Sequence, residues 1–147
     1  AMSVEALELF DRTLEWARAA DAGDGTKLVD QAWVQRDLAE CKARMNAMNL
    51  LNWQMVKAVE DDTLTGPQAS GVKVYGTEAV VAVYNLLLGI VGSAGRPRPG
   101  SPGAILAGRL ERAGRSGQIN TFGGGVNEIQ RDMIAWMRLG LSRPGKR

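Results

Sequence analysis

Histidine is absent from the 147 residues of this sequence, and cysteine occurs only once. Without histidine the chain cannot form a Ser-His-Asp or Cys-His catalytic arrangement, and most zinc and di-iron sites of helical proteins are excluded. We therefore predict no metal site. The single Cys41 cannot form an internal disulfide, so a small buried thiol and a reducing, cytoplasmic compartment are expected.

Aromatic residues are also scarce, at 5% of the chain, whereas hydrophobic residues make up 45%. Because aliphatic residues, alanine and methionine supply most of that fraction, helices are favoured over a β-sandwich. The 18 basic and 16 acidic residues give a formal charge of +2, which is too even to indicate a nucleic-acid or membrane partner. The apolar run 79–91 is too short to cross a bilayer and contains Asn85, so we expect a soluble protein of one domain, residues 1–147.

Apolar residues at helical spacing predict four or five helices separated by glycine- and proline-containing segments. The second is the best defined, because apolar residues repeat in steps of four and three along it. That seam consists of Val34, Leu38, Cys41, Met45, Met48, Asn52, Met55 and Val59. Asn52 is expected to meet a polar partner across the bundle, since an unpaired buried amide is costly. The first predicted helix ends near residue 22 and the second begins at residue 30. The third spans 68–91 and the fourth spans 105–119. The last begins at Asn127, which is expected to cap it.

These elements predict an all-α fold, an antiparallel up-and-down four-helix bundle with a short extra helix. The third helix is apolar on all sides and should occupy the centre. The segment 93–103 contains three prolines and is either an exposed connector or an excursion that faces a substrate.

Gly123, Gly124 and Gly125 form the feature that most suggests function. Three residues without Cβ atoms let the backbone approach a ligand closely, and the helix that follows offers free N–H groups. A glycine-rich turn between packed helices would look the same. A row of Arg109, Arg112 and Arg115 could bind phosphate or an acidic partner, but we expect a row that is solvated or forms salt bridges between helices.

The final part of the chain carries a longer pattern, which leads into an apolar helix and Leu139-Gly140-Leu141. It resembles the terminal signature of acyl-CoA dehydrogenases, in which Gly-Thr-(Asn/Ser)-(Glu/Gln)-Ile-Gln-Arg leads the last helix. The resemblance covers essentially the whole chain and implies that family's C-terminal four-helix domain, without its N-terminal helical and middle β-domains. The matching residues are Thr121-Phe122-Gly123-Gly124-Gly125-Val126-Asn127-Glu128-Ile129-Gln130-Arg131.

The resemblance implies a flavoprotein that removes an α-proton and a β-hydride from an acyl-CoA, passing the hydride to FAD to leave a trans-2-enoyl-CoA. It also implies a tetrameric assembly and an electron-transfer flavoprotein or similar acceptor. The implied substrate-binding residues are Phe122, Gly123 and Gly124. The implied cofactor-binding residues are Gly125, Val126, Asn127 and Glu128.

Three positions depart from the family pattern. Many members carry the catalytic base as glutamate at the position of Gly124, which cannot accept a proton, so the base is expected upstream of Ala1 or on a partner subunit. The usual Arg-x-x-Phe-Gly is replaced by Asp21-Ala22-Gly23-Asp24-Gly25, and the usual glutamine of Gln-x-x-Gly-Gly falls at Gly89. A full FAD site on this surface is therefore in question, and the chain alone is expected to be inactive.

Such losses resemble the bacterial acyl-CoA dehydrogenases built from two unlike subunits, and room at Gly124 would suit a bulky acyl group such as a steroid side chain. Two alternatives stay open at this point. The chain could belong to a non-catalytic subunit that packs an oligomer and completes a neighbour's site. It could also be a free-standing helical interaction module with no relation to flavoproteins.

Overall fold

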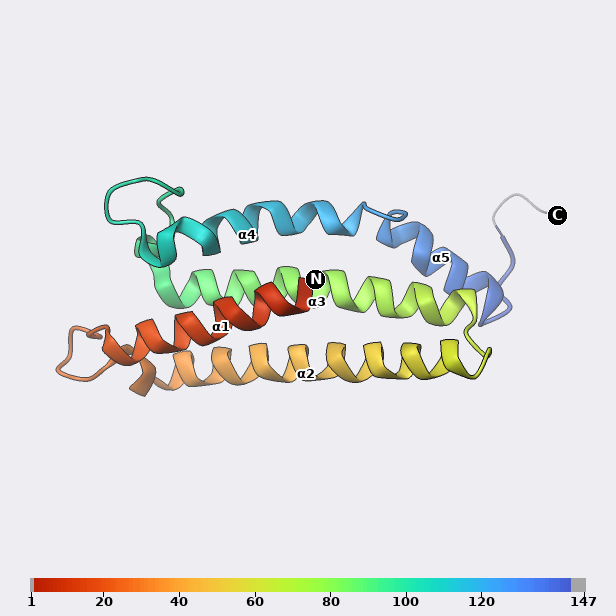
Figure 1. Cartoon of the computed structure of the whole chain (residues 1–147), viewed down its shortest axis with the longest axis horizontal. Helices are drawn as coiled ribbons and strands as arrows, with labels where there is room; N and C mark the ends of the chain where they lie inside the picture. The colour runs from red at the N-terminus through yellow and green to blue at the C-terminus, as the bar shows by residue number, and fades with distance from the viewer. Residues whose placement is uncertain (1, 144–147) are drawn as a thin grey trace.

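The computed structural model describes residues 2–143 and is built from helices (Figure 1). Within that range no β-strand forms, and the only β-type pairing is an isolated bridge between Asp21 and Lys27. The α-helices are α1 (Met2–Ala19), α2 (Ala32–Glu60), α3 (Gly66–Val91), α4 (Arg109–Gly117) and α5 (Asn127–Met137). Short 3-10 helices are η1 (Leu28–Asp30), η2 (Gly92–Gly95), η3 (Ile105–Gly108) and η4 (Gln118–Thr121).

Helices α1, α2 and α3 follow one another up and down, and α4 and α5 then run in succession along α3 as the fourth column of the bundle (Figure 1). The predicted all-α, antiparallel bundle is thus confirmed. The extra helix arises because the Gly123–Gly125 turn divides the fourth column into α4 and α5.

Helix α3 is the central element, since α1, α2, α4 and α5 all pack against it. Val80, Val83 and Leu87 on α3 are almost completely buried. Of the described residues, only the helical stretch 66–95 is long and apolar enough to cross a membrane, with mean hydropathy 1.6 over its most apolar window. More than half of that window is buried inside the bundle, as expected for a core helix that contacts neighbours on every side.

Helix α2 begins at Ala32, two residues after the predicted start, because Asp30 belongs to η1, where its carboxylate accepts a hydrogen bond from the Lys27 N–H. Along the predicted seam, residues 34–48 are buried and Cys41 is fully enclosed. Burial raises the pKa of the Cys41 thiol to about 12. The seam leaves the core after Met48, so Asn52 is only half-buried and its predicted burial is wrong.

The predicted helix 105–119 is regular only in α4, because Leu106, Ala107 and Gly108 all have left-handed backbone angles. A side chain at Gly108 would collide with the backbone of Arg98 and Pro99, so the proline-rich segment folds back onto this point. Gly114 and Gly117 bring α4 close to Leu88 and Tyr84 of α3.

Two arginines of the row on α4 make salt bridges and Arg112 is exposed, as expected from the sequence. Arg109 forms two bonds to Glu8 of α1, at 2.6 and 2.8 Å, and Arg115 bonds Glu111 within α4.

Candidate functional site

The residues predicted to bind substrate and cofactor lie together on the turn between η4 and α5 (Figure 1). Phe122, Gly123, Gly124 and Gly125 are exposed, Val126 is half-buried, and Glu128 is exposed on the first turn of α5. Phe122 has 65% of its surface exposed, which is a large apolar area for an unpartnered ring. The exposed residues 122–125 are therefore accessible to a binding partner or ligand. We call residues 121–127 the glycine turn.

The backbone of the glycine turn requires glycine at two positions. Gly124 and Gly125 have φ of +69° and +97°, in the region that favours glycine over all other residues. A side chain at Gly125 would also meet Nε2 of Gln130 at 2.6 Å, whereas one at Gly124 would have open space around it. Gln130 Nε2 donates to the Gly124 carbonyl at 3.2 Å, which fixes the turn from the α5 side.

Asn127 does not cap α5, which corrects the prediction made from its type and position. The capping residue is Val126, without a side-chain bond, and Asn127 is the first helical residue. Its side chain is buried, with 2% exposed, and its Nδ2 donates to Thr77 Oγ1 and Glu78 Oε1 of α3. Asn127 thus joins α5 to α3, and the N–H groups at the start of α5 are left without a side-chain cap.

Lys73 of α3 holds the glycine turn from the opposite side. Its Nζ donates to the carbonyls of Thr121 (3.1 Å) and Gly125 (2.6 Å) and to Asn127 Oδ1 (2.6 Å). An ammonium group has three donors, so these contacts use its full capacity.

A second charged pair extends this contact along α3 and α5. Glu78 pairs with Arg131 at 2.7 Å. That hydrogen bond is the main reason why the pKa of Glu78 lies below its ordinary value.

Sequence reasoning overlooked the α3 half of this network. A signal for it exists: Lys73, Thr77 and Glu78 are polar residues at helical spacing within a helix that is otherwise apolar.

The Asp21–Gly25 segment stands where the family pattern has an arginine. Both of its carboxylates accept hydrogen bonds from nearby side chains of this chain. Asp24 accepts hydrogen bonds from the Thr26 hydroxyl and N–H and from Gln31 Nε2. The bond to the Thr26 hydroxyl contributes most to lowering the pKa of Asp24. Asp21 pairs with Lys27 at 2.6 Å. Two carboxylates do not suit a diphosphate, so this segment does not fit that part of FAD.

Gly89 lies in a groove of about 630 Å³ between the end of α3 and α4, together with Arg96, Glu111 and Arg115. The two guanidinium groups suit an anion, but the Glu111 carboxylate beside them opposes one. Glu111 Oε1 accepts from Arg115 Nε at 2.9 Å, while Oε2 is buried without a hydrogen-bond partner in the described part of the chain. Sequence reasoning did not place Arg96, Glu111 and Arg115 beside Gly89.

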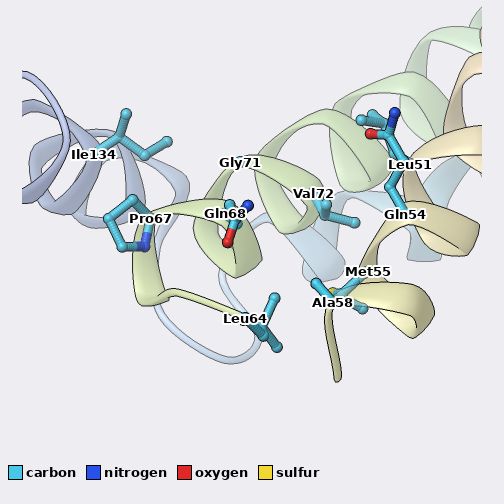
Figure 2. Close-up of a pocket in the computed structure, with 10 residues that line it drawn as sticks. All are labelled: Leu51, Gln54, Met55, Ala58, Leu64, Pro67, Gln68, Gly71, Val72 and Ile134. Atoms are coloured by element: carbon cyan, nitrogen blue, oxygen red, sulfur yellow. The ribbon is translucent and has the colours of Figure 1, made fainter. Parts of the chain in front are cut away.

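A second groove, of about 380 Å³, lies where α2, α3 and α5 meet (Figure 2). Its lining contains no ionisable side chain, so it offers an apolar contact surface rather than a catalytic site. Within residues 2–143 no three histidine, cysteine or carboxylate side chains gather closely enough to hold a metal ion. The residues lining the groove are Leu51, Gln54, Met55, Ala58, Leu64, Pro67, Gln68, Gly71, Val72 and Ile134.

Comparison with known proteins connects this geometry to a family. Residues 1–138 match the family model described as "Acyl-CoA dehydrogenase, C-terminal domain". Acyl-CoA dehydrogenase FadE26 of Mycobacterium tuberculosis is 42% identical over 135 residues, which are 90% of this chain and 34% of that protein.

Two solved structures share the fold closely. A structure named Tcur3481-Tcur3483 steroid ACAD is 51% identical, with a TM-score of 0.85 over 94% of this chain and 34% of the solved chain. The ChsE4-ChsE5 complex from Mycobacterium tuberculosis is 40% identical, with a TM-score of 0.88 over 96% of this chain and 36% of the solved chain. The chain spans about a third of the length of these relatives, and an unrelated helical interaction module is excluded. The chain belongs to the acyl-CoA dehydrogenase family, as a C-terminal helical domain of these flavoproteins.

Proposed function

We propose that this chain contributes the glycine turn to the flavin and acyl-thioester site of a larger acyl-CoA dehydrogenase. The reaction is the removal of an α-proton and a β-hydride from an acyl-CoA, leaving a trans-2-enoyl-CoA. Bound FAD would accept the hydride. The observation that supports the proposal is the exposed, doubly anchored glycine turn, where the family signature begins before it continues into α5.

The residues of the turn have distinct proposed roles. Phe122, Gly123 and Gly124 line the acyl-thioester side, where the exposed ring excludes water and the absent side chains leave room for the thioester backbone. Gly125, Val126, Glu128 and the backbone N–H of Asn127 face the cofactor, where the uncapped start of α5 suits a polar ring edge or an anion, while the Asn127 side chain is turned toward α3.

The catalytic base is proposed to lie outside this chain, in polypeptide upstream of Ala1 or on a partner subunit. Gly124 carries no carboxylate, and its φ of +69° is unfavourable for a glutamate in the same place. Open space around Gly124 supports a bulky acyl group, and the likeness to a steroid acyl-CoA dehydrogenase supports a polycyclic one.

The assembly is proposed to be a heteromer, by likeness to the ChsE4-ChsE5 complex, and a cytoplasmic location is proposed because a lone cysteine suits a reducing compartment. Electrons would leave through an electron-transfer flavoprotein or a similar acceptor.

The test is a pair of glycine substitutions in the full-length protein with its partner subunit. Gly125→Ala forces a side chain into a left-handed residue and against Gln130, so the turn shifts and kcat/KM falls by about 10- to 100-fold. Gly140→Ala is the matched control, because φ is +68° there and a Cβ meets nothing within 4 Å. Equal activity of the two variants, measured with a steroid side-chain acyl-CoA and an artificial electron acceptor, contradicts the proposed site.

A second candidate is a non-catalytic subunit that completes a partner's site without holding its own flavin. The closed Asp21–Gly25 segment and the Glu111 carboxylate in the Gly89 groove favour it, since both oppose a diphosphate. The ratio of FAD to protomers in the purified full-length assembly separates the candidates. One FAD per protomer supports a catalytic subunit, and one per two unlike protomers supports the non-catalytic one.

The 147-residue chain alone is proposed to be inactive, because it offers neither the base nor a complete cofactor site. Incubation with FAD, an acyl-CoA and an artificial acceptor should give no turnover above the rate without protein. Measurable turnover contradicts both the assignment of the base and the incomplete cofactor site.

A further inference from the structure

Lys73 connects three points of the glycine turn to the central helix. The carbonyl of Thr121 precedes the three glycines, the carbonyl of Gly125 ends them, and the Asn127 side chain opens α5. One ammonium group therefore spans the whole turn. No other side chain in the described part of the chain bonds both sides of the glycine triplet.

The positive charge of Lys73 lies near the start of α5, where it does not stabilise the helix. A cation near the start of a helix opposes the helix dipole, so stabilisation of α5 does not explain this lysine. Glu78 lies five residues further along α3 and is paired with Arg131, and the Lys73 charge makes only a small contribution to its lowered pKa. What the ammonium does instead is satisfy two backbone carbonyls that a glycine-rich turn leaves without helical partners.

Consecutive glycines make such an anchor necessary for a defined geometry. Glycine loses more conformational freedom on folding than any other residue, and three in sequence can adopt many turn conformations. Gln130 restrains the Gly124 carbonyl alone. Without Lys73, the Thr121 and Gly125 carbonyls would turn toward solvent, and the direction of the Gly124–Gly125 peptides would no longer be fixed.

We propose that Lys73 is a positioning residue, which sets the geometry of the glycine turn against the flavin and acyl-thioester without touching either. Its three donors are all used within the chain, so it cannot also bind a ligand. The positioning role rests on the proposed function, because it assumes that the glycine turn lies against the flavin and acyl-thioester. The anchoring of the turn by Lys73 does not depend on that function.

The experiment replaces Lys73 in the full-length protein with its partner subunit. Lys73→Met keeps the length of the side chain and removes the ammonium, while Lys73→Arg keeps a cation whose planar fork cannot serve three acceptors around one nitrogen. Lys57→Met is the matched control, because Lys57 is exposed and its ion pair with Asp61 lies on the surface of α2.

Two measurements are made on each variant. Hydrogen–deuterium exchange of peptides covering residues 118–130 reports the geometry of the turn. The values of kcat and KM, with a steroid side-chain acyl-CoA and an artificial acceptor, report its consequence. A shift of the turn by about 1 Å costs on the order of 100-fold in rate.

For Lys73→Met we expect at least about tenfold faster exchange in residues 118–130 and at least about tenfold lower kcat per bound flavin, with Tm reduced by only a few degrees. Lys73→Arg should have a higher kcat than Lys73→Met although the two variants have similar Tm values. If Lys73 only stabilised the fold, two variants with the same Tm would have the same kcat. Lys57→Met should change neither measurement more than twofold.

Unchanged exchange in Lys73→Met overturns the anchor, and faster exchange with unchanged kcat overturns the positioning role. If the unmodified assembly binds no FAD and oxidises no acyl-CoA, the proposed function fails instead. In that case the exchange measurement still decides whether Lys73 holds the turn.

Discussion

The two halves of α2 have the same apolar spacing but different surroundings. From Val34 to Met48 the seam is buried between α1 and α3, with Cys41 fully enclosed. Beyond Met48 the seam is only partly covered, since Asn52 and Met55 are half-buried and Val59 is 60% exposed. The spacing of apolar residues therefore predicted a helix correctly, but it did not predict which part of the helix would have a partner.

The difference follows from helix length. At 1.5 Å per residue, the 29 residues of α2 extend over about 44 Å, whereas the 18 residues of α1 extend over about 27 Å. Figure 1 shows that α1 runs from near the middle of the bundle to the end where α2 begins. The later half of α2 is left with α3 on one side and the apolar groove of Figure 2 beside it.

The largest expected effect comes from one substitution made in each half. Met45 has 3% of its surface exposed, so Met45→Ala should reduce the free energy of unfolding by about 2–5 kcal/mol through lost contacts and a cavity. Met55 is only half-buried at the wall of the apolar groove, and Met55→Ala should cost below about 1 kcal/mol. Urea denaturation of the 147-residue chain measures both values.

Equal losses at Met45 and Met55 would contradict the contrast between the halves. The pair is well matched, because both residues are methionines on the same seam of one helix. The midpoint of unfolding should move while its slope stays constant, since neither substitution alters the surface that unfolding exposes by much.

The fold was largely predictable because its signals are local. Heptad spacing and the breaks at glycine and proline depend on neighbours in sequence, and the structure begins α2 and α3 two residues from their predicted starts. The left-handed angles at Leu106 and Ala107 were not predictable, because they depend on the proline-rich segment that packs against Gly108.

The candidate site was predictable on one side only. The glycine turn was identified by its own sequence, whereas Lys73 is about 50 residues away and pairs with it only in the folded chain. Asn127 shows the same limit: its residue type favours a cap, but burial against Thr77 and Glu78 provides better partners than the start of its own helix.

An intermediate effect is expected for self-association of the 147-residue chain. Leu50, Trp53 and Val56 lie three residues apart on one face of α2 and are exposed, and contiguous apolar surface of this kind favours contacts between copies. Trp53→Lys should weaken self-association about tenfold, since buried tryptophan contributes strongly at interfaces. Sedimentation velocity at several concentrations measures the effect.

Trp33 provides the control from the first half of α2. It is 41% exposed, but it lies near the start of the helix, away from the apolar groove. Trp33→Lys should change self-association less than twofold. A larger effect at Trp33 than at Trp53 would place the contact surface on the first half of α2, which α1 covers. It would contradict the expectation that the second half self-associates.

The smallest effect is expected from breaking the ion pair between Glu8 of α1 and Arg109 of α4. Helix α1 is the helix that covers the first half of α2. The hydrogen bond from Arg109 is the main reason why the pKa of Glu8 falls from 4.5 to about 2. Because this pKa is lowered in the folded chain, the stabilisation is fully present above about pH 4.5 and is lost as the pH falls toward 2. Glu8→Gln should therefore lower Tm at pH 6 by a small amount, since the pair is exposed and screened by solvent.

Between about pH 4.5 and 2 the Tm difference between Glu8→Gln and the unmodified chain should shrink steadily, because protonation removes the same charge that the substitution removes. Glu15→Gln, an exposed carboxylate on α1, controls for the loss of one negative charge. Thermal unfolding from pH 2 to 7 measures the three proteins. A difference that stays constant across this range would mean that Glu8 acts through packing rather than through its charge, and that α1 is held on the covered half by apolar contacts alone.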